Sequence, residues 1–205
     1  MRRQNGFGLI ELMIALALGL TLIAGILSVF LSTLQSNTDL ANNQQLDNEM
    51  QATMDLMIRD LRRAGGNGSP SPLPNFTNPF GLGSLGAYSG EAANSCVLFS
   101  YDLNNNGVLD TASSSDERFG YRLKQGVVQM RTGGLSCTQD SWINITTPAV
   151  VKVTQLQFTI VPMTDGGMVV NRISVLMTGQ LTRNAGVTRS LTSNVRVRND
   201  VWTPS

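Results

Sequence analysis

Apolar residues dominate the start of the chain and then give way to a helical pattern. Residues 7–31 are almost wholly apolar, and a helix of about 20 such residues spans a bilayer. Further on, apolar side chains recur at mostly helical spacings with polar residues between them. They are Leu34, Leu40, Leu46, Met50, Met54, Met57, Ile58 and Leu61. Three glycines at 65, 66 and 68, followed by Pro70, predict that the helix ends near Ala64.

The pattern therefore predicts one long helix with two environments. Its first part, residues 7–31, is expected to span a membrane. Its second part, residues 32–64, is amphipathic and is expected to pack on a head domain. Residues 65–94 are rich in Gly, Ser, Pro and Asn and predict an irregular connecting loop.

The remaining residues, 95–205, predict a β-rich globular head. Runs rich in Val, Ile, Thr and aromatic residues often alternate with polar positions, as in strands with one buried face. These runs are residues 96–101, 118–123, 127–131, 150–161, 171–181 and 188–198. Turns are predicted at 125–126, 165–167 and 184–186. A long helix packed on an antiparallel β-sheet is an α+β fold.

Composition narrows the function classes. The 205 residues suffice for one domain and an anchor, and the net charge of +1 gives no indication of a nucleic-acid partner. Histidine is absent, which excludes catalytic triads that use imidazole as the base and metal sites that use imidazole as a ligand. Lys124 and Lys152 lie in no recognisable catalytic motif, and the acidic pair Asp116-Glu117 is typical of a solvated turn. We therefore expect no enzymatic activity; a membrane-anchored periplasmic enzyme is the weakest alternative.

The apolar segment also sets the topology and carries one unusual residue. Arg2 and Arg3 precede it, so the positive-inside rule places the N-terminus in the cytoplasm and the head outside. The segment is longer than the apolar part of a secretory signal, and no small-residue cleavage site follows it. Glu11 lies inside the segment, where a carboxylate is costly unless it has a partner.

The residues from Gly6 to Ala15 resemble the class III signal of type IV pilins and type II secretion pseudopilins. The resemblance implies that a prepilin peptidase cleaves after Gly6, which removes the leader peptide 1–6, and that the new N-terminal residue, Phe7, is N-methylated. It also implies that Glu11 pairs with the N-terminal amine of a neighbouring subunit. After assembly, residues 7–31 are then expected to pack against the same segment of neighbouring subunits and to form the filament core. The expected location is the inner membrane, in a single pass with a periplasmic head, and then the pilus at the cell surface.

The head is similar to minor pilins of the PilW type. The segments that carry this resemblance are residues 100–102, 117–123 and 195–199. It implies a minor pilin, a structural subunit that takes part in type IV pilus assembly in a priming complex or at the tip. The implied partners are other minor and major pilins, the prepilin peptidase and the inner-membrane assembly platform. The main alternative is a minor pseudopilin of a type II secretion or DNA-uptake system; the large head disfavours a major pilin.

The two cysteines, Cys96 and Cys137, are far apart in sequence, so they form neither a C-x-x-C redox pair nor a zinc knuckle. In an exported head they are expected to form a disulfide. The alternative is two separate buried thiols.

The sequence from 102 to 110 matches the first half of a calcium loop, with Gly107 at the sharp turn. The residues that would supply oxygen ligands are Asp102, Asn104, Asn106, Val108 (through its carbonyl) and Asp110. Ser113 stands where such loops carry a bidentate glutamate, and Asp116 or Glu117 could replace it only in a wider loop. The alternative is an Asx-capped turn without metal. Calcium is the single candidate cofactor.

Overall fold

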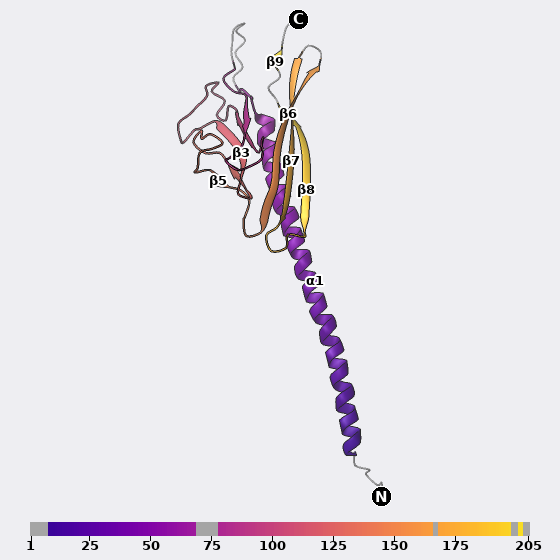
Figure 1. Ribbon diagram of the computed structural model, residues 1–205. Helices are drawn as coiled ribbons and strands as arrows, with labels where there is room; N and C mark the ends of the chain where they lie inside the picture. The colour runs from indigo at the N-terminus through magenta and orange to yellow at the C-terminus, as the bar shows by residue number, and fades with distance from the viewer. Residues whose placement is uncertain (1–7, 69–77, 166–167, 198–200, 203–205) are drawn as a thin grey trace. The chain divides into compact units, whose positions relative to one another are not determined.

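The computed structural model describes residues 8–68, 78–165, 168–197 and 201–202. The chain divides into two compact units, Met1–Gln44 and Gln45–Ser205. One helix, α1 (Leu9–Arg63), runs through both units (Figure 1). Its bounds confirm the predicted long helix to within two residues at each end; residue 7, where we expect it to begin, lies outside the described residues.

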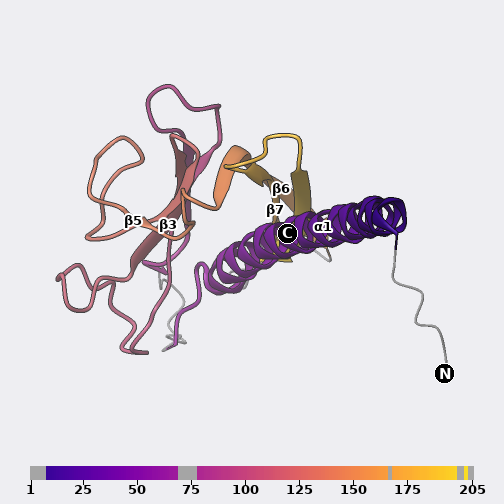
Figure 2. The same ribbon diagram turned by 90° about the horizontal axis from the view of Figure 1, so that it is seen from below.

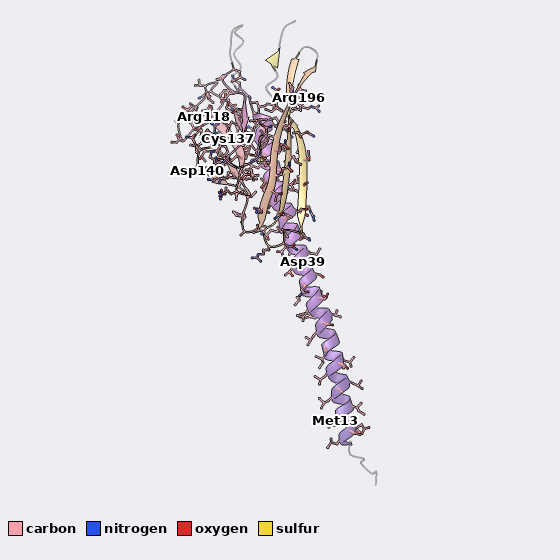
Figure 3. The ribbon with its side chains drawn as sticks, in the orientation of Figure 1. Met13, Asp39, Arg118, Cys137, Asp140 and Arg196 are labelled. Carbon is pink, nitrogen blue, oxygen red and sulfur yellow. A yellow bond between two sulfur atoms is a disulfide. The ribbon has the colours of Figure 1, made fainter. Side chains whose placement is uncertain are left out.

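The first unit is described from Gly8 and consists of the N-terminal part of α1, whose apolar side chains are exposed. Leu9 is 81% exposed and Phe30 is still 57% exposed, and the Met13 side chain stands out from the helix in Figure 3. An 18-residue window of α1 has a mean hydropathy of 2.6. Within the described chain, α1 is the one helix long and apolar enough to cross a membrane.

The strands of the second unit form two antiparallel sheets. The first sheet runs in sequence order through β1 (Leu82–Gly86), β2 (Cys96–Ser100), β3 (Arg118–Lys124), β4 (Val127–Met130) and β5 (Ile143–Asn144). The second sheet contains β6 (Val151–Asp165), β7 (Met168–Leu181) and β8 (Thr188–Arg196), with β9 (Val201–Trp202) paired to β7. Figure 2 shows β3 and β5 in one layer and β6 and β7 in another.

These strands confirm the α+β class and all six predicted strands, which are β2, β3, β4, β6, β7 and β8. The head has two sheets where we expect one. The predicted irregular connection over 65–94 is wrong at β1, a glycine-rich strand with a register irregularity between Leu82 and Leu85. Its order comes from backbone pairing with β2, which leaves no hydrophobic alternation in the sequence. The two-residue strands β5 and β9 are also too short to leave a pattern.

The predicted hairpin turns join the expected strands. Gln125 and Gly126 both have positive φ, 51° and 83°, as the tight turn between β3 and β4 requires. Asp165 pairs with Met168 around the turn predicted at 165–167, of which residues 166 and 167 lie outside the described residues. The third turn, 184–186, connects β7 to β8.

The C-terminal part of α1 lies against both sheets. Its buried apolar face consists of Leu46, Met50, Met54, Met57 and Leu61, each no more than 5% exposed. This face shares one core with side chains from both sheets, such as Phe99 of β2 and Phe158 of β6. Burial of each such side chain contributes about 1.5–3 kcal/mol to folding.

The helical spacing identifies the packed face but not where packing begins. Leu34 and Leu40 continue the same pattern, yet they are 47% and 58% exposed and lie in the first unit. The spacing alone does not distinguish these exposed positions from the buried ones further along α1. Gly179 of β7 contributes to the contact between α1 and the second sheet, because a Cβ at this position would collide with the Met50 Sδ. A glycine at this position lets the helix approach the sheet closely.

Candidate functional site

The candidate assembly site is the exposed apolar surface of the first unit, and Glu11 is its one acidic residue between Gly8 and Leu31. The carboxylate lies in the first turn of α1, where the helix dipole favours a negative charge. Its Oε2 accepts one long hydrogen bond, 3.4 Å, from the Gly8 N–H. The flanking Ile10 and Leu12 are 74% and 57% exposed. In a hydrocarbon environment such a carboxylate requires a cation beside it.

Two of the predicted processing residues, Gly6 and Phe7, lie outside the described residues. Cleavage after Gly6 and methylation of Phe7 therefore stay predictions from the sequence. The same holds for the pairing of Glu11 with an amine on another subunit.

The predicted disulfide between Cys96 and Cys137 is present. It joins the start of β2 to the segment between β4 and β5 across 41 residues of chain, with a Cα–Cα distance of 6.0 Å. Trp142 packs against it in a small second cluster, separate from the main core. The bridge therefore holds the loop-rich side of the first sheet, where Figure 3 labels Cys137.

A buried arginine supports this bridge, and no pattern in the sequence had indicated this contact. The Arg122 Nη1 donates to the carbonyls of Cys137 and Gln139, at 2.8 and 2.6 Å. Its guanidinium lies over the rings of Tyr88 and Trp142, 4.8 and 4.5 Å from their centroids. Burial lowers the pKa of Arg122 from its ordinary value. The carbonyl and aromatic contacts stabilise the buried cation and fix the segment that carries the disulfide.

A second buried polar contact fixes the end of α1 on the first sheet. The Tyr121 hydroxyl donates to the Asp60 Oδ2 at 2.5 Å, and both residues are buried. Burial, together with this hydrogen bond to a carboxylate, raises the pKa of Tyr121 well above its usual range. One turn on, the Arg63 guanidinium lies 4.1 Å from the Tyr101 ring centroid. Sequence periodicity placed Asp60 on the helix but could not identify its partner.

The predicted calcium loop is organised by backbone N–H groups that donate to carboxylates. The Asp102 Oδ1 accepts from the N–H of Asn106 at 3.2 Å. Its Oδ2 accepts from the N–H groups of Gly68 and Gly107 at 3.1 and 2.9 Å. Burial opposes ionisation of Asp102, but these backbone hydrogen bonds outweigh it and lower the pKa of the carboxyl.

Glu117 holds the other side of the same loop. It is fully buried, and its carboxylate accepts from the N–H groups of Leu103 at 2.7 Å and Asp110 at 3.0 Å. Our prediction of a solvated turn at Asp116-Glu117 is therefore wrong for Glu117. The burial is compensated by backbone donors that lie seven and fourteen residues away, which no local pattern reveals. Asp116 instead pairs with Arg118 at 2.7 Å.

The predicted ligand residues do come together, but they bond to one another. The Oδ1 atoms of Asn104 and Asn106 accept the N–H groups of Asn106 and Val108. Their side-chain amides donate to the Asp110 Oδ2, at 2.7 and 3.1 Å. Among the described residues there is no group of three or more His, Cys, Asp or Glu side chains that could hold a metal ion. The arrangement fits the Asx-capped turn better than a cation site, and calcium binding stays a prediction from spacing alone.

Two family matches, one to the N-terminal segment and one to most of the remaining chain, relate this protein to known proteins. Residues 39–197 match the family described as prepilin peptidase-dependent protein B, and residues 1–27 match the prokaryotic N-terminal methylation motif. A similar relative is the prepilin peptidase-dependent protein B of Escherichia coli (strain K12), which is 26% identical over 157 residues. This alignment covers 76% of the present chain and 77% of the relative. No solved structure matches the chain.

Proposed function

This chain belongs to the prepilin peptidase-dependent protein B family, and from that membership we propose that it is a minor pilin. In this role it is a structural subunit that enters a type IV pilus through a priming complex or at the tip. The finding that carries the proposal is the N-terminal methylation motif at the head of a helix whose apolar surface is exposed and bears one carboxylate.

The chemistry of the first unit supports a role in two successive environments. Before assembly, the apolar part of α1 anchors the subunit in the inner membrane, because a helix satisfies its own backbone hydrogen bonds in lipid. Cleavage after Gly6 by a prepilin peptidase creates a new amine at Phe7, and methylation keeps it cationic. This amine and Glu11 of a neighbouring subunit then form an ion pair within packed apolar helices, where an unpaired carboxylate would be costly.

The proposed partners follow from this path. They are the prepilin peptidase, the inner-membrane assembly platform and the other minor and major pilins. The head, residues 95–205, is proposed to lie in the periplasm and then on the pilus, together with the part of α1 that packs on it. A role in assembly and not in catalysis is supported by the absence of histidine from the sequence and by the structural use of the buried Asp60 and Glu117 carboxylates.

A minor pseudopilin of a type II secretion or DNA-uptake system is the alternative. It would carry the same N-terminal signal and use Glu11 in the same way. The PilW-like segments of the head, residues 100–102, 117–123 and 195–199, favour the pilus.

Peptide mass spectrometry on sheared surface filaments and on the remaining membranes tests the proposal. We expect a peptide that begins at methylated Phe7 in the filaments. The same peptide found in the membranes alone would favour the pseudopilus. A chain that keeps residues 1–6 in both fractions would overturn the whole proposal, and a Gly6→Val variant supplies the uncleaved standard for the search.

A further inference from the structure

A small hollow in the head lies where the loop before β3 meets the segment after β4. Its volume is about 220 Å³. Its charged and hydroxyl-bearing lining residues include Ser113, Ser114, Ser115, Asp116, Arg118 and Arg131. All of them belong to the second unit, and Figure 3 labels Arg118 on this side of the head. The hollow is therefore a feature of the head alone.

The carboxylate in the hollow is already occupied by one of the two arginines. The Asp116 Oδ1 accepts from the N–H and the Nε of Arg118, both at 2.9 Å. Its Oδ2 accepts from the Arg118 Nη2 at 2.7 Å. Three donors of one residue fill most of the lone-pair sites of a carboxylate. Asp116 thus neutralises Arg118 and has little capacity for a second cation.

The other arginine, Arg131, bonds only to neutral groups among the described residues. Its Nε and Nη2 donate to the carbonyls of Leu135 and Gly134, both at 2.6 Å, and its Nη1 donates to the Phe119 carbonyl at 3.4 Å. Carbonyl oxygens satisfy the donors but do not cancel the charge. Burial lowers the pKa of Arg131, and the like charge of Arg118 lowers it further. Two arginines and one aspartate leave the hollow with one positive charge in excess.

Hydroxyl groups and an apolar wall complete the lining. Within the part of the chain that the structure describes, no group bonds to the hydroxyls of Ser113, Ser114 or Ser115, so all three can donate to an oxyanion. Phe119 and Leu103 form the apolar wall, and Leu103 is 49% exposed. One excess charge suits a carboxylate better than a phosphate, which carries nearly two charges at neutral pH.

We propose that this hollow binds a carboxylate carried on a short apolar group, with Arg131 as the counter-charge and the serine hydroxyls as further donors. Hydrogen bonds between a guanidinium and a carboxylate are among the stronger ones in proteins. A free organic acid and an acidic side chain of another subunit offer the same chemistry. The site goes beyond the function proposed above, because residues of the head alone form it.

Titration of the full-length chain in detergent with butyrate tests the proposal by NMR. We expect saturable shifts of the backbone amides of Ser113, Ser114 and Ser115 and of the Arg131 Nε–H. Butyramide has nearly the same shape without the charge and should cause none of these shifts. Equal shifts with butyramide would show an apolar cavity only, and no shifts with butyrate would show no site; either result overturns the proposal.

Arg131→Gln removes the charge and keeps a donor for the loop carbonyls. It should weaken butyrate binding about tenfold, since a hydrogen bond to a charged group is lost. Arg62→Gln is the matched control, because it removes an exposed arginine of α1 that does not line the hollow, and it should bind butyrate as wild type does. Unchanged binding by Arg131→Gln would overturn the proposal.

A second variant decides the matter if Arg131→Gln fails to fold. Ser114→Glu supplies a carboxylate from the chain itself at an exposed position and leaves the carbonyl contacts of Arg131 intact. It should raise the melting temperature by about 2–4 °C and abolish the butyrate shifts, whereas Ser114→Gln should do neither. Wild-type butyrate binding by Ser114→Glu would overturn the proposal.

Photocross-linking in cells distinguishes the two sources of the carboxylate. A photoreactive residue at position 114 of the full-length chain should cross-link to another subunit if that subunit supplies the carboxylate, and Arg131→Gln should remove the adduct. Butyrate binding by the purified chain without a cross-link in cells would assign the site to a free acid. Each of these two results supports the site and identifies its ligand.

Discussion

Large apolar side chains are exposed along the first part of α1 and buried along the second. Between Leu9 and Leu31 the large apolar side chains are more than half exposed, whereas Leu46, Met50 and Met57 further along are at most 1% exposed. The head also buries polar groups, such as Asp60 and Glu117, and satisfies them internally. The second unit thus covers its large apolar side chains with its own residues. The first unit requires lipid or other subunits to cover them.

The difference shows where function and stability reside. A change in the first unit should alter assembly and leave the unfolding of the head unchanged. A change in the head's polar or covalent contacts should alter its stability first.

Glu11→Ala should be cleaved normally but should enter filaments at least about 100-fold less, because the subunit loses the carboxylate proposed to pair with a neighbouring amine. Loss of one partner of a buried ion pair costs about 3–5 kcal/mol, and each 1.4 kcal/mol is about tenfold. Quantitative immunoblots of sheared filaments and membranes measure the effect. The melting temperature of the head should not change, since the one described hydrogen bond of Glu11 is to Gly8.

Leu12→Ala is the matched control for the apolar surface around Glu11. It removes a similar amount of side chain without touching a charge, so it should incorporate nearly as well as wild type. Normal incorporation of Glu11→Ala would refute amine pairing, and with it the conclusion that Glu11 in the first unit governs assembly.

Replacement of both Cys96 and Cys137 by alanine should lower the free energy of unfolding by about 4 kcal/mol. The reason is that the unfolded chain regains the conformational entropy that the disulfide removes by closing a loop of 41 residues. Guanidinium unfolding of the full-length chain in detergent gives the value. Reduction of the wild-type disulfide is the matched control and should produce the same loss. An unchanged midpoint would show that the Arg122 contacts alone hold the segment around Cys137.

Periodicity predicted most of the fold, because both α1 and the long strands bury one face along a regular repeat. The disulfide was predicted on different grounds, because two cysteines in an exported head have few other uses. The exposure of Leu34 and Leu40 could not be predicted in the same way, because a helical repeat does not record where packing ends. β1 was missed for a related reason: its order comes from β2, not from its own side chains.

Within the candidate sites, the sequence located Glu11 by its cost in an apolar segment, but it misjudged the acids of the head. Glu117 looks like half of a solvated pair until the backbone N–H groups of Leu103 and Asp110 are seen to converge on it. The oxygen spacing from Asp102 to Asp110 likewise suits either calcium or an Asx turn. Only the hydrogen-bond directions distinguish the two.

The smallest predicted effect concerns that loop. Asp102→Ala should lower the stability of the head by about 1–3 kcal/mol at neutral pH, since three backbone N–H groups lose their acceptor. The folded pKa of Asp102 is lowered, so its contribution is complete above the unfolded value of about 4 and is lost as pH falls through the folded pKa. The variant should therefore lose less stability than wild type between neutral pH and about pH 3.

Calcium provides the deciding control for this prediction. A turn held by N–H donors to Asp102 and Glu117 should melt at the same temperature in calcium and in chelator, and Asp102→Ala should cost the same in both. A calcium site would instead raise the melting temperature of wild type, by mass action on the folded state, and the variant would abolish that shift. Asn104→Ala, which removes a predicted ligand but not a carboxylate, separates the two: it should cost little in a turn and should weaken calcium binding in a metal loop. A calcium-dependent shift would make the head, like the first unit, dependent on something outside the chain.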